Sequence, residues 1–124
     1  MARRKRDRPK PPPLPTPTET YTSPDGEHTL VLAGVLSPRS RVRFAEISDP
    51  SNANAAATIE DVRQGAIAFL FSALVREWTV SGVTATKSKP VMDRFKIATP
   101  AERQWILEVL RAHCAEWFPE LRVP

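Results

Sequence analysis

Cysteine, glycine and long apolar runs are all scarce in this chain of 124 residues. The single cysteine, Cys114, excludes a disulfide bond within the chain and gives no argument for secretion. Gly26, Gly34, Gly65 and Gly82 are scattered, so the sequence has no glycine-rich phosphate-binding loop. No segment approaches the roughly 20 apolar residues of a membrane-spanning helix. We therefore expect a soluble cytoplasmic protein that does not act at a membrane.

Residues that bind metals or act as nucleophiles are also few. Two histidines and one cysteine fall short of the roughly four ligands of a zinc site. His113 and Cys114 are neighbours on a predicted helix, where side chains point about 100° apart, so we expect both to be buried and structural. The helix dipole accounts for the acidic residues near helix starts and on polar faces, which are Glu60, Asp61, Glu102 and Glu108. The sequence thus predicts no enzyme, cofactor, metal or small-molecule substrate.

The surplus positive charge is confined to the first twenty residues. The net charge of +4 arises there, because residues 21–124 hold twelve basic and twelve acidic side chains. The basic residues of this segment are Arg3, Arg4, Lys5, Arg6, Arg8 and Lys10. A charged appendage on a neutral body predicts contact with nucleic acid or another acidic partner. A solvated tail without a partner and a localisation signal also fit this pattern.

Proline is concentrated in the same segment. Its positions are Pro9, Pro11, Pro12, Pro13, Pro15 and Pro17. Each proline fixes φ and biases the preceding residue toward extended geometry. We therefore expect residues 1–20, here called the arm, to be disordered or extended in the polyproline II manner. Arg6, Pro9 and Pro12 also match the spacing of proline-helix ligands, although proline-rich spacers produce this pattern by chance.

Residues 21–124 are expected to form one small domain that begins with a β-hairpin. The turn Ser23–Gly26 has proline at its second position and glycine at its fourth. This turn predicts that residues 19–22 pair with residues 28–32. Gly34 is expected to weaken the second strand or to mark a bulge.

A short helix is predicted from Ser37 and Pro38, although alternation in the residues that follow also fits a strand. A strong helix is predicted over residues 59–78, with Thr58 as its N-cap. Residues 83–96 are expected to form a long loop with a short strand near Val91.

The last predicted helix begins at Thr99 and Pro100 and is stopped by Pro119. The predicted fold class is therefore α+β and mainly helical, with an N-terminal β-hairpin followed by about three helices.

The helix predicted over residues 59–78 is apolar on more than one side, because Ile67 and Phe71 lie off its main stripe. Such a helix is either central to its domain or pressed on a partner. Trp105 lies off the inward stripe of the last helix, and tryptophan is a favoured interface anchor. The predicted partner-binding residues are Phe69, Leu70, Phe71, Leu74, Trp78 and Trp105.

One family resemblance covers roughly residues 28–118. Residues 68–80, AFLFSALVREWTV, place an apolar helix before a leucine–valine, two-residue, tryptophan end. Residues 89–91 and 98–100 look like the linker and closing helix of the same pattern, and residues 36–39, LSPR, match loosely. In these features the chain resembles the tail assembly chaperones of long-tailed phages and related prophages.

The resemblance implies a small, non-catalytic helical protein that binds tape-measure and tail-tube proteins in the host cytoplasm during assembly. Formation of a homo-oligomer is compatible with it. The basic arm departs from the family pattern and supports a second interpretation. In that interpretation the chain is a structural virion component whose arm contacts nucleic acid or an acidic neighbouring subunit.

Overall fold

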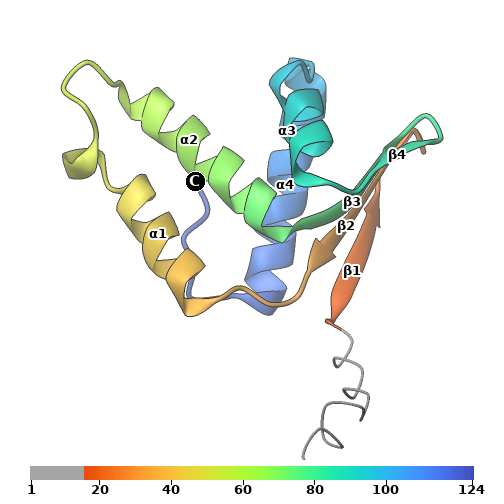
Figure 1. The fold of residues 1–124 in the computed structure, drawn as a ribbon, viewed down its shortest axis with the longest axis horizontal. Coiled ribbons are helices and arrows are strands. Elements are labelled where there is room, and N and C mark those ends of the chain that lie inside the picture. The colour runs from red at the N-terminus through yellow and green to blue at the C-terminus, as the bar shows by residue number, and fades with distance from the viewer. Residues whose placement is uncertain (1–15) are drawn as a thin grey trace, which may run out of the picture.

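The computed structural model describes residues 16–124 (Figure 1). This part of the chain has an α+β fold with four α-helices and a four-stranded antiparallel sheet. In chain order the elements are β1 (Thr18–Thr22), β2 (His28–Ala33), α1 (Pro38–Ser48), the 3-10 turn η2 (Pro50–Asn52), α2 (Ile59–Leu74), β3 (Val75–Val80), β4 (Val83–Ala85), α3 (Ser88–Lys96) and α4 (Pro100–Trp117).

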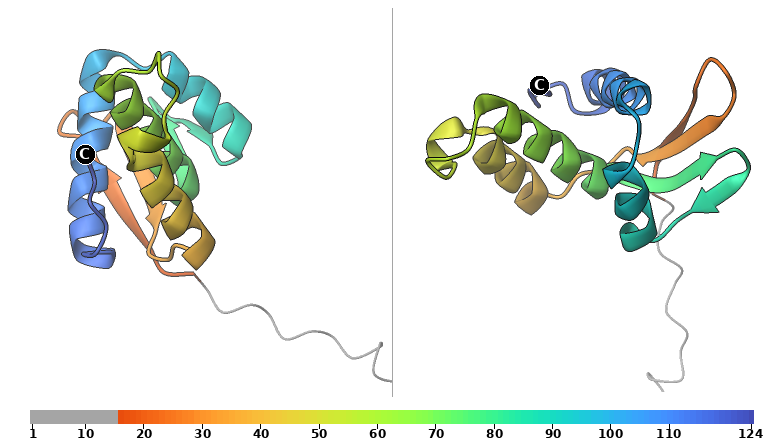
Figure 2. Two further views of the ribbon diagram at one scale, coloured as in Figure 1. Left: turned by 90° about the vertical axis from the view of Figure 1, so that its left-hand side faces the viewer. Right: turned by 90° about the horizontal axis from the view of Figure 1, so that it is seen from above.

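The strands lie in the order β1-β2-β3-β4, so α1 and α2 are inserted between two neighbouring strands. Tyr21 lies opposite Leu30, Leu30 opposite Trp78, and Trp78 opposite Ala85. The face that carries these residues packs against α4, while α3 lies at the β4 side of the sheet (Figure 2).

The opposite face of the sheet is polar. One threonine from each strand contributes to a row that crosses the sheet, formed by Thr22, Thr29, Thr79 and Thr84. The hydroxyl oxygens of Thr79 and Thr84 lie 2.8 Å apart, within hydrogen-bond distance. Successive side chains of a strand alternate between faces, so this row is the solvent-facing counterpart of the buried set.

The predicted hairpin is confirmed, and the amide of Gly26 closes its turn by donating to the Ser23 carbonyl over 2.9 Å. The expectation for Gly34 was wrong. The irregularity in β2 lies between Val31 and Leu32. Gly34 instead lies under Trp117, where a Cβ atom would come within 2.6 Å of the indole ring. Close packing of a side chain, not strand geometry, therefore requires glycine here.

The helix starts that the sequence predicts near Ser37, Thr58 and Thr99 are confirmed. The Ser37 side chain accepts the amide of Ser40, and Thr58 and Thr99 each form a complete capping box. Satisfying these otherwise free amides is the physical reason why serine and threonine begin helices. The last helix ends at Trp117, just before Pro119, as predicted.

The predicted helix over residues 59–78 is too long. Helix α2 ends at Leu74, and residues 75–80 form β3, which pairs with β2. Trp78 is fully buried, but it reaches the core from a strand. Valine and threonine favour strands in this segment, and pairing with β2 supplies the hydrogen bonds that a longer helix would have made.

The loop predicted over residues 83–96 was also wrong. This segment forms β4 and the helix α3, which raises the number of helices in the described residues to four, and the hairpin becomes part of a four-stranded sheet. Val91 and Phe95 are spaced four residues apart and bury one side of α3. Arg94 donates to the carbonyl oxygens of Trp78 and Val83, which attaches α3 to the sheet.

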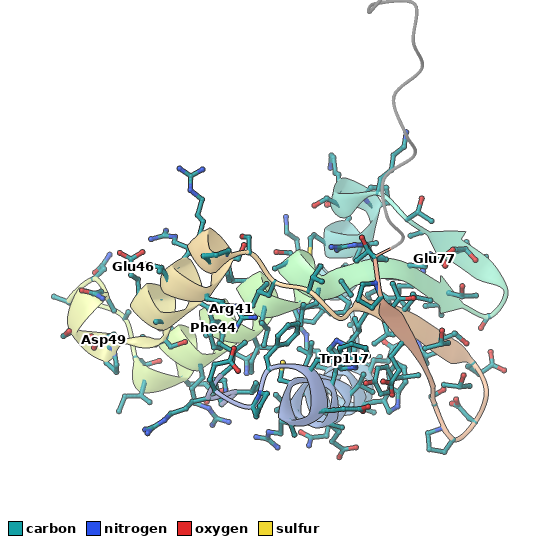
Figure 3. All side chains as sticks on the ribbon, turned by 90° about the horizontal axis from the view of Figure 1, so that it is seen from below. Arg41, Phe44, Glu46, Asp49, Glu77 and Trp117 are labelled. Atoms are coloured by element: carbon teal, nitrogen blue, oxygen red, sulfur yellow. The ribbon has the colours of Figure 1, made fainter. Side chains whose placement is uncertain are left out.

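The buried apolar residues form one cluster, with members from Leu30 to Phe118. Helices α1 and α2 lie side by side and project from one end of the sheet (Figure 1). The segment after α4 turns back toward α1, where Glu120 forms an ion pair with Arg41. Glu46 and Asp49 lie toward the distant end of the helical pair, whereas Trp117 lies beside the sheet (Figure 3).

Candidate partner-binding site

Four of the six predicted partner-binding residues have no exposed surface. Leu70, Phe71, Leu74 and Trp78 are each 0% exposed and belong to the core of this chain. Their prediction as partner contacts is therefore wrong for the chain as folded here. The remaining two, Phe69 and Trp105, are partly buried and pack against the edge of the core.

Helix α3 explains why Phe71 is buried. The Phe71 ring lies 5.0 Å from the Phe95 ring of α3 and 5.5 Å from the Trp78 ring of β3. The second apolar side of α2, which suggested a partner, is therefore covered by the segment that the sequence indicated as a loop.

The predicted contacts of the arm (Arg3, Arg4, Lys5, Arg6, Arg8 and Lys10) lie outside the described residues.

A hollow of about 350 Å³ opens between the projecting ends of α1 and α2. We call it the interhelix hollow. Its apolar lining comes from Ile47, Ala53, Ala57, Val62 and Gly65, and its polar lining from Arg43, Glu46, Asn52 and Asp61. Elements on both sides of the α1–α2 connection therefore contribute to one concave surface at the end of the molecule that is remote from the sheet.

Hydrogen bonds hold the rim of the interhelix hollow. The side-chain amide of Asn52 donates to the Glu46 carbonyl over 3.1 Å, which ties the connection to α1. The Thr58 amide donates to the Asp61 carboxylate, and this bond, together with the Thr58 hydroxyl, lowers the pKa of Asp61. Bonds from the Ser51 amide and hydroxyl lower the pKa of Asp49 in the same way. Both carboxylates are thereby kept ionised and in place.

Apolar surface extends outward from this hollow. Val42 is 61% exposed on the outer side of α1, beside Arg43 and Glu46, which also line the hollow. Ile59 is 71% exposed in the first turn of α2. Val42 thus places exposed apolar surface beside a concave one, an arrangement typical of protein-binding sites. The sequence does not indicate Val42 or Ile59 as binding residues, because their spacing alone does not distinguish a core position from an exposed one.

Gly65 is the most unusual residue in this hollow. It lies inside α2, where glycine is less favourable than alanine by about 0.5–1 kcal/mol. A Cβ atom at this position would meet nothing within 4 Å, so packing within the chain does not require glycine. A glycine inside a predicted helix is visible in the sequence alone. Because the space beside Gly65 is open, this glycine marks a place where another molecule can approach the helix backbone.

The buried polar groups near α4 form a structural network. The Nε2–H group of His113 donates to the Ala33 carbonyl over 2.7 Å, and Nδ1 accepts from the Tyr21 hydroxyl over 2.8 Å. A carbonyl only accepts, which fixes this tautomer. Burial raises the pKa of the Cys114 thiol to about 11. The expected burial of His113 and Cys114 is confirmed, and neither group is arranged as an activated nucleophile.

Trp105 borders a second hollow, of about 280 Å³, between the β1–β2 turn and the start of α4. We call it the Trp105 hollow. Its lining residues are Ser23, Pro24, Asp25, His28, Ala101, Glu102 and Trp105. The Nε2 atom of His28 lies 3.1 Å from the Glu102 carboxylate, and the Trp78 indole N–H donates to Nδ1 over 3.4 Å. These bonds fix the inner wall of the hollow.

Comparisons with known proteins identify no relative of this chain. No family model, no curated protein and no solved structure matches the chain. Within residues 16–124, no helix combines the length and the apolar character needed to cross a membrane. The same residues contain no group of three or more side chains positioned to hold a metal ion.

Proposed function

We propose that this chain is a non-enzymatic assembly protein that binds tape-measure or tail-tube proteins of a long-tailed phage. The assignment to phage tails rests on the resemblance of residues 28–118 to tail assembly chaperones. In this proposal the protein acts in the host cytoplasm during assembly. It requires no cofactor, metal or small-molecule substrate.

The observation that carries the proposal is the interhelix hollow with Gly65 at its wall. A helix of another protein that lies across α2 comes closest to the backbone where no side chain intervenes. Glycine permits this approach, and its cost to the isolated helix is then offset only in the complex. Val42 lies beside the hollow, next to Arg43 and Glu46 of its lining, and adds exposed apolar surface that such a helix would bury.

The test is co-expression of the full chain with the tape-measure and tail-tube proteins of its own genome, followed by measurement of binding. Gly65→Ala should weaken binding about tenfold while it leaves the fold intact, since the added methyl group occupies the space that the partner needs. Loss of binding together with an unchanged or raised unfolding temperature supports the proposal. Unchanged binding by Gly65→Ala, or no binding of either partner to the natural chain, contradicts it.

A matched pair of valines provides the control. Val42 and Val83 are 61% and 62% exposed, but Val42 lies beside the interhelix hollow and Val83 lies on β4. Val42→Ser should weaken binding several-fold, because it removes apolar surface from the interface. Val83→Ser should bind as the natural chain does. Equal effects of the two substitutions would show that general surface hydrophobicity, not this site, controls the association.

The charge of the arm favours a second candidate, a virion component that contacts nucleic acid or an acidic neighbour. The net charge of +4 comes from the first twenty residues. A contact with phosphates weakens steeply as salt rises. Deletion of residues 1–10 should therefore abolish salt-sensitive retention on DNA if this function holds. The same deletion should leave binding of the tape-measure protein unchanged if the first proposal holds.

A further inference from the structure

The Trp105 hollow combines an apolar floor with a negative rim. The Trp105 indole, the Pro24 ring and Ala101 supply the apolar surface, and the carboxylates of Asp25 and Glu102 stand at its edge. Among the described residues that line it, none is a lysine or an arginine. An aromatic surface beside fixed carboxylates matches a ligand that is both proline-rich and basic.

Both carboxylates are held in place before any ligand arrives. Asp25 accepts the Ser23 hydroxyl over 2.5 Å and the Glu27 amide over 3.0 Å, and both bonds end on Oδ1. These bonds lower the pKa of Asp25 and keep it charged. Glu102 accepts the Thr99 amide over 2.7 Å, and that bond lowers its pKa. Binding therefore does not have to order the acidic groups.

The ring of Trp105 is also supported from behind. It lies 5.7 Å from the His28 ring, which in turn contacts Glu102 and Trp78. One side of the indole is thus packed within the chain, while Trp105 as a whole remains partly exposed. This arrangement provides a rigid aromatic surface on which a proline ring can pack.

The sequence of this chain contains a segment with the required chemistry. The arm carries six basic residues and six prolines, and it accounts for the net charge of the protein. We propose that the Trp105 hollow binds the basic proline-rich arm of a second copy of this chain. Pro11, Pro12 and Pro13 would pack on Trp105, and the arginines and lysines that precede them would pair with Asp25 and Glu102.

The position of the arm favours a second copy over the same copy. The last residues of the predicted arm, 18–20, form the start of β1, whereas the hollow lies beyond Thr22, at the other end of that strand. The carbonyl of Pro17 accepts the Gly34 amide over 2.7 Å, which attaches the chain to β2 at this end. Residues 1–20 contain no glycine, and their prolines disfavour a tight reversal. A head-to-tail contact of this type joins the arm of one copy to the hollow of the next. It does not involve the interhelix hollow.

The proposal is tested by sedimentation of the full chain over a range of concentrations. We expect association at low salt that weakens about tenfold when the salt is raised to about 0.5 M, because partly exposed charges are screened. The double variant Asp25→Asn/Glu102→Gln should associate about tenfold more weakly. The charge-matched control Glu77→Gln/Glu116→Gln, which leaves the hollow intact, should associate as the natural chain does. A natural chain that stays monomeric at all concentrations overturns the proposal.

Mixing two variants distinguishes the second copy from other occupants. The first variant carries Asp25→Asn/Glu102→Gln, and the second carries serine in place of the four basic residues 3–6. Each alone should be largely monomeric. Together they should form a 1:1 dimer, because the arm of the first fits the hollow of the second. If no heterodimer forms on mixing, the proposal is overturned. The arm then binds within its own copy or binds a different molecule, such as DNA. Since Gly65 is natural in both variants, this outcome is independent of tape-measure binding.

Discussion

Trp117 packs against Gly34 so closely that the indole occupies the place of a side chain next to β2. A Cβ atom at residue 34 would lie 2.6 Å from two carbons of the ring. The indole N–H of Trp117 also donates to Glu19 over 3.0 Å, so the ring is fixed at both ends. This contact joins the end of α4 to the first two strands.

Replacing Gly34 with alanine should therefore destabilise the protein. The added methyl group forces Trp117 to move and costs about 1–3 kcal/mol, as overpacking of a core does. The measurement is the free energy of unfolding in urea. Gly82→Ala is not a suitable control, because Gly82 has a positive φ of 82° and alanine would be strained there. An unchanged stability of Gly34→Ala would show that the ring is free to shift.

Gly65→Ala should have the opposite effect on stability. The position is helical, its φ is not in the left-handed region, and no atom lies within 4 Å of an added Cβ. Alanine in place of glycine then stabilises the helix by about 0.5–1 kcal/mol. Thermal unfolding of the purified full chain measures this effect without any partner. A lower unfolding temperature would mean that the space beside Gly65 is filled.

Phe95→Ala should cost about 3–5 kcal/mol, because it opens a cavity beside Phe71. The control is Ile97→Ala, two residues further along, since Ile97 is 83% exposed and its truncation should change stability by a few tenths of a kcal/mol at most. Should Phe95→Ala unfold the chain completely, Phe95→Leu provides a milder change. If Phe95→Leu and Ile97→Ala cost the same, α3 does not cover α2.

Stability should decline at high pH because of Tyr21. Burial is the main cause that raises the pKa of Tyr21 above its ordinary value of 10.0, and the nearby Glu19 adds to it. Its stabilising contribution is therefore fully present below pH 10 and is lost as the pH rises through the folded-state pKa. Urea unfolding at and above pH 10 should show a shallower decline of the unfolding free energy for Tyr21→Phe than for the natural chain. An identical decline in both proteins would contradict the assignment.

The same residue permits a direct measurement. The chain has one tyrosine, so the absorbance of tyrosinate reports Tyr21 alone. We expect the midpoint in the folded chain to lie above the midpoint in urea. The thiol of Cys114 also ionises at high pH, but it is present in both the natural chain and the Tyr21→Phe variant, so its effect cancels in their comparison.

Local signals were sufficient to predict the hairpin and the starts of three helices. The Pro24–Gly26 turn and the caps at Ser37, Thr58 and Thr99 each depend on residues close in sequence. The strand β3 was not predictable in this way. The spacing of apolar residues around Trp78 fits a buried side chain in either a helix or a strand. Only pairing with β2, which lies far earlier in the chain, selects the strand.

The candidate site was predictable only in part, for a related reason. Helix α3 has two buried residues, Val91 and Phe95, among many polar ones, so its sequence resembles a loop. Without α3, Phe71 lacks its contact with Phe95, and the apolar side of α2 that carries Phe71 is interpreted as a binding surface. Trp105 was correctly predicted to lie apart from the inward stripe, since it is partly exposed at a hollow.

The row formed by Thr22, Thr29, Thr79 and Thr84 has a consequence for how the sheet avoids sticking to other sheets. Threonine is β-branched and stiffens a strand as valine does, but its oxygen keeps the surface hydrated. The strands thus retain their geometry on this side without a second layer of helices. Replacing the four threonines with valine would preserve that geometry but create an exposed apolar stripe. The four hydroxyl groups thus keep this face of the sheet hydrated and protect it from aggregation.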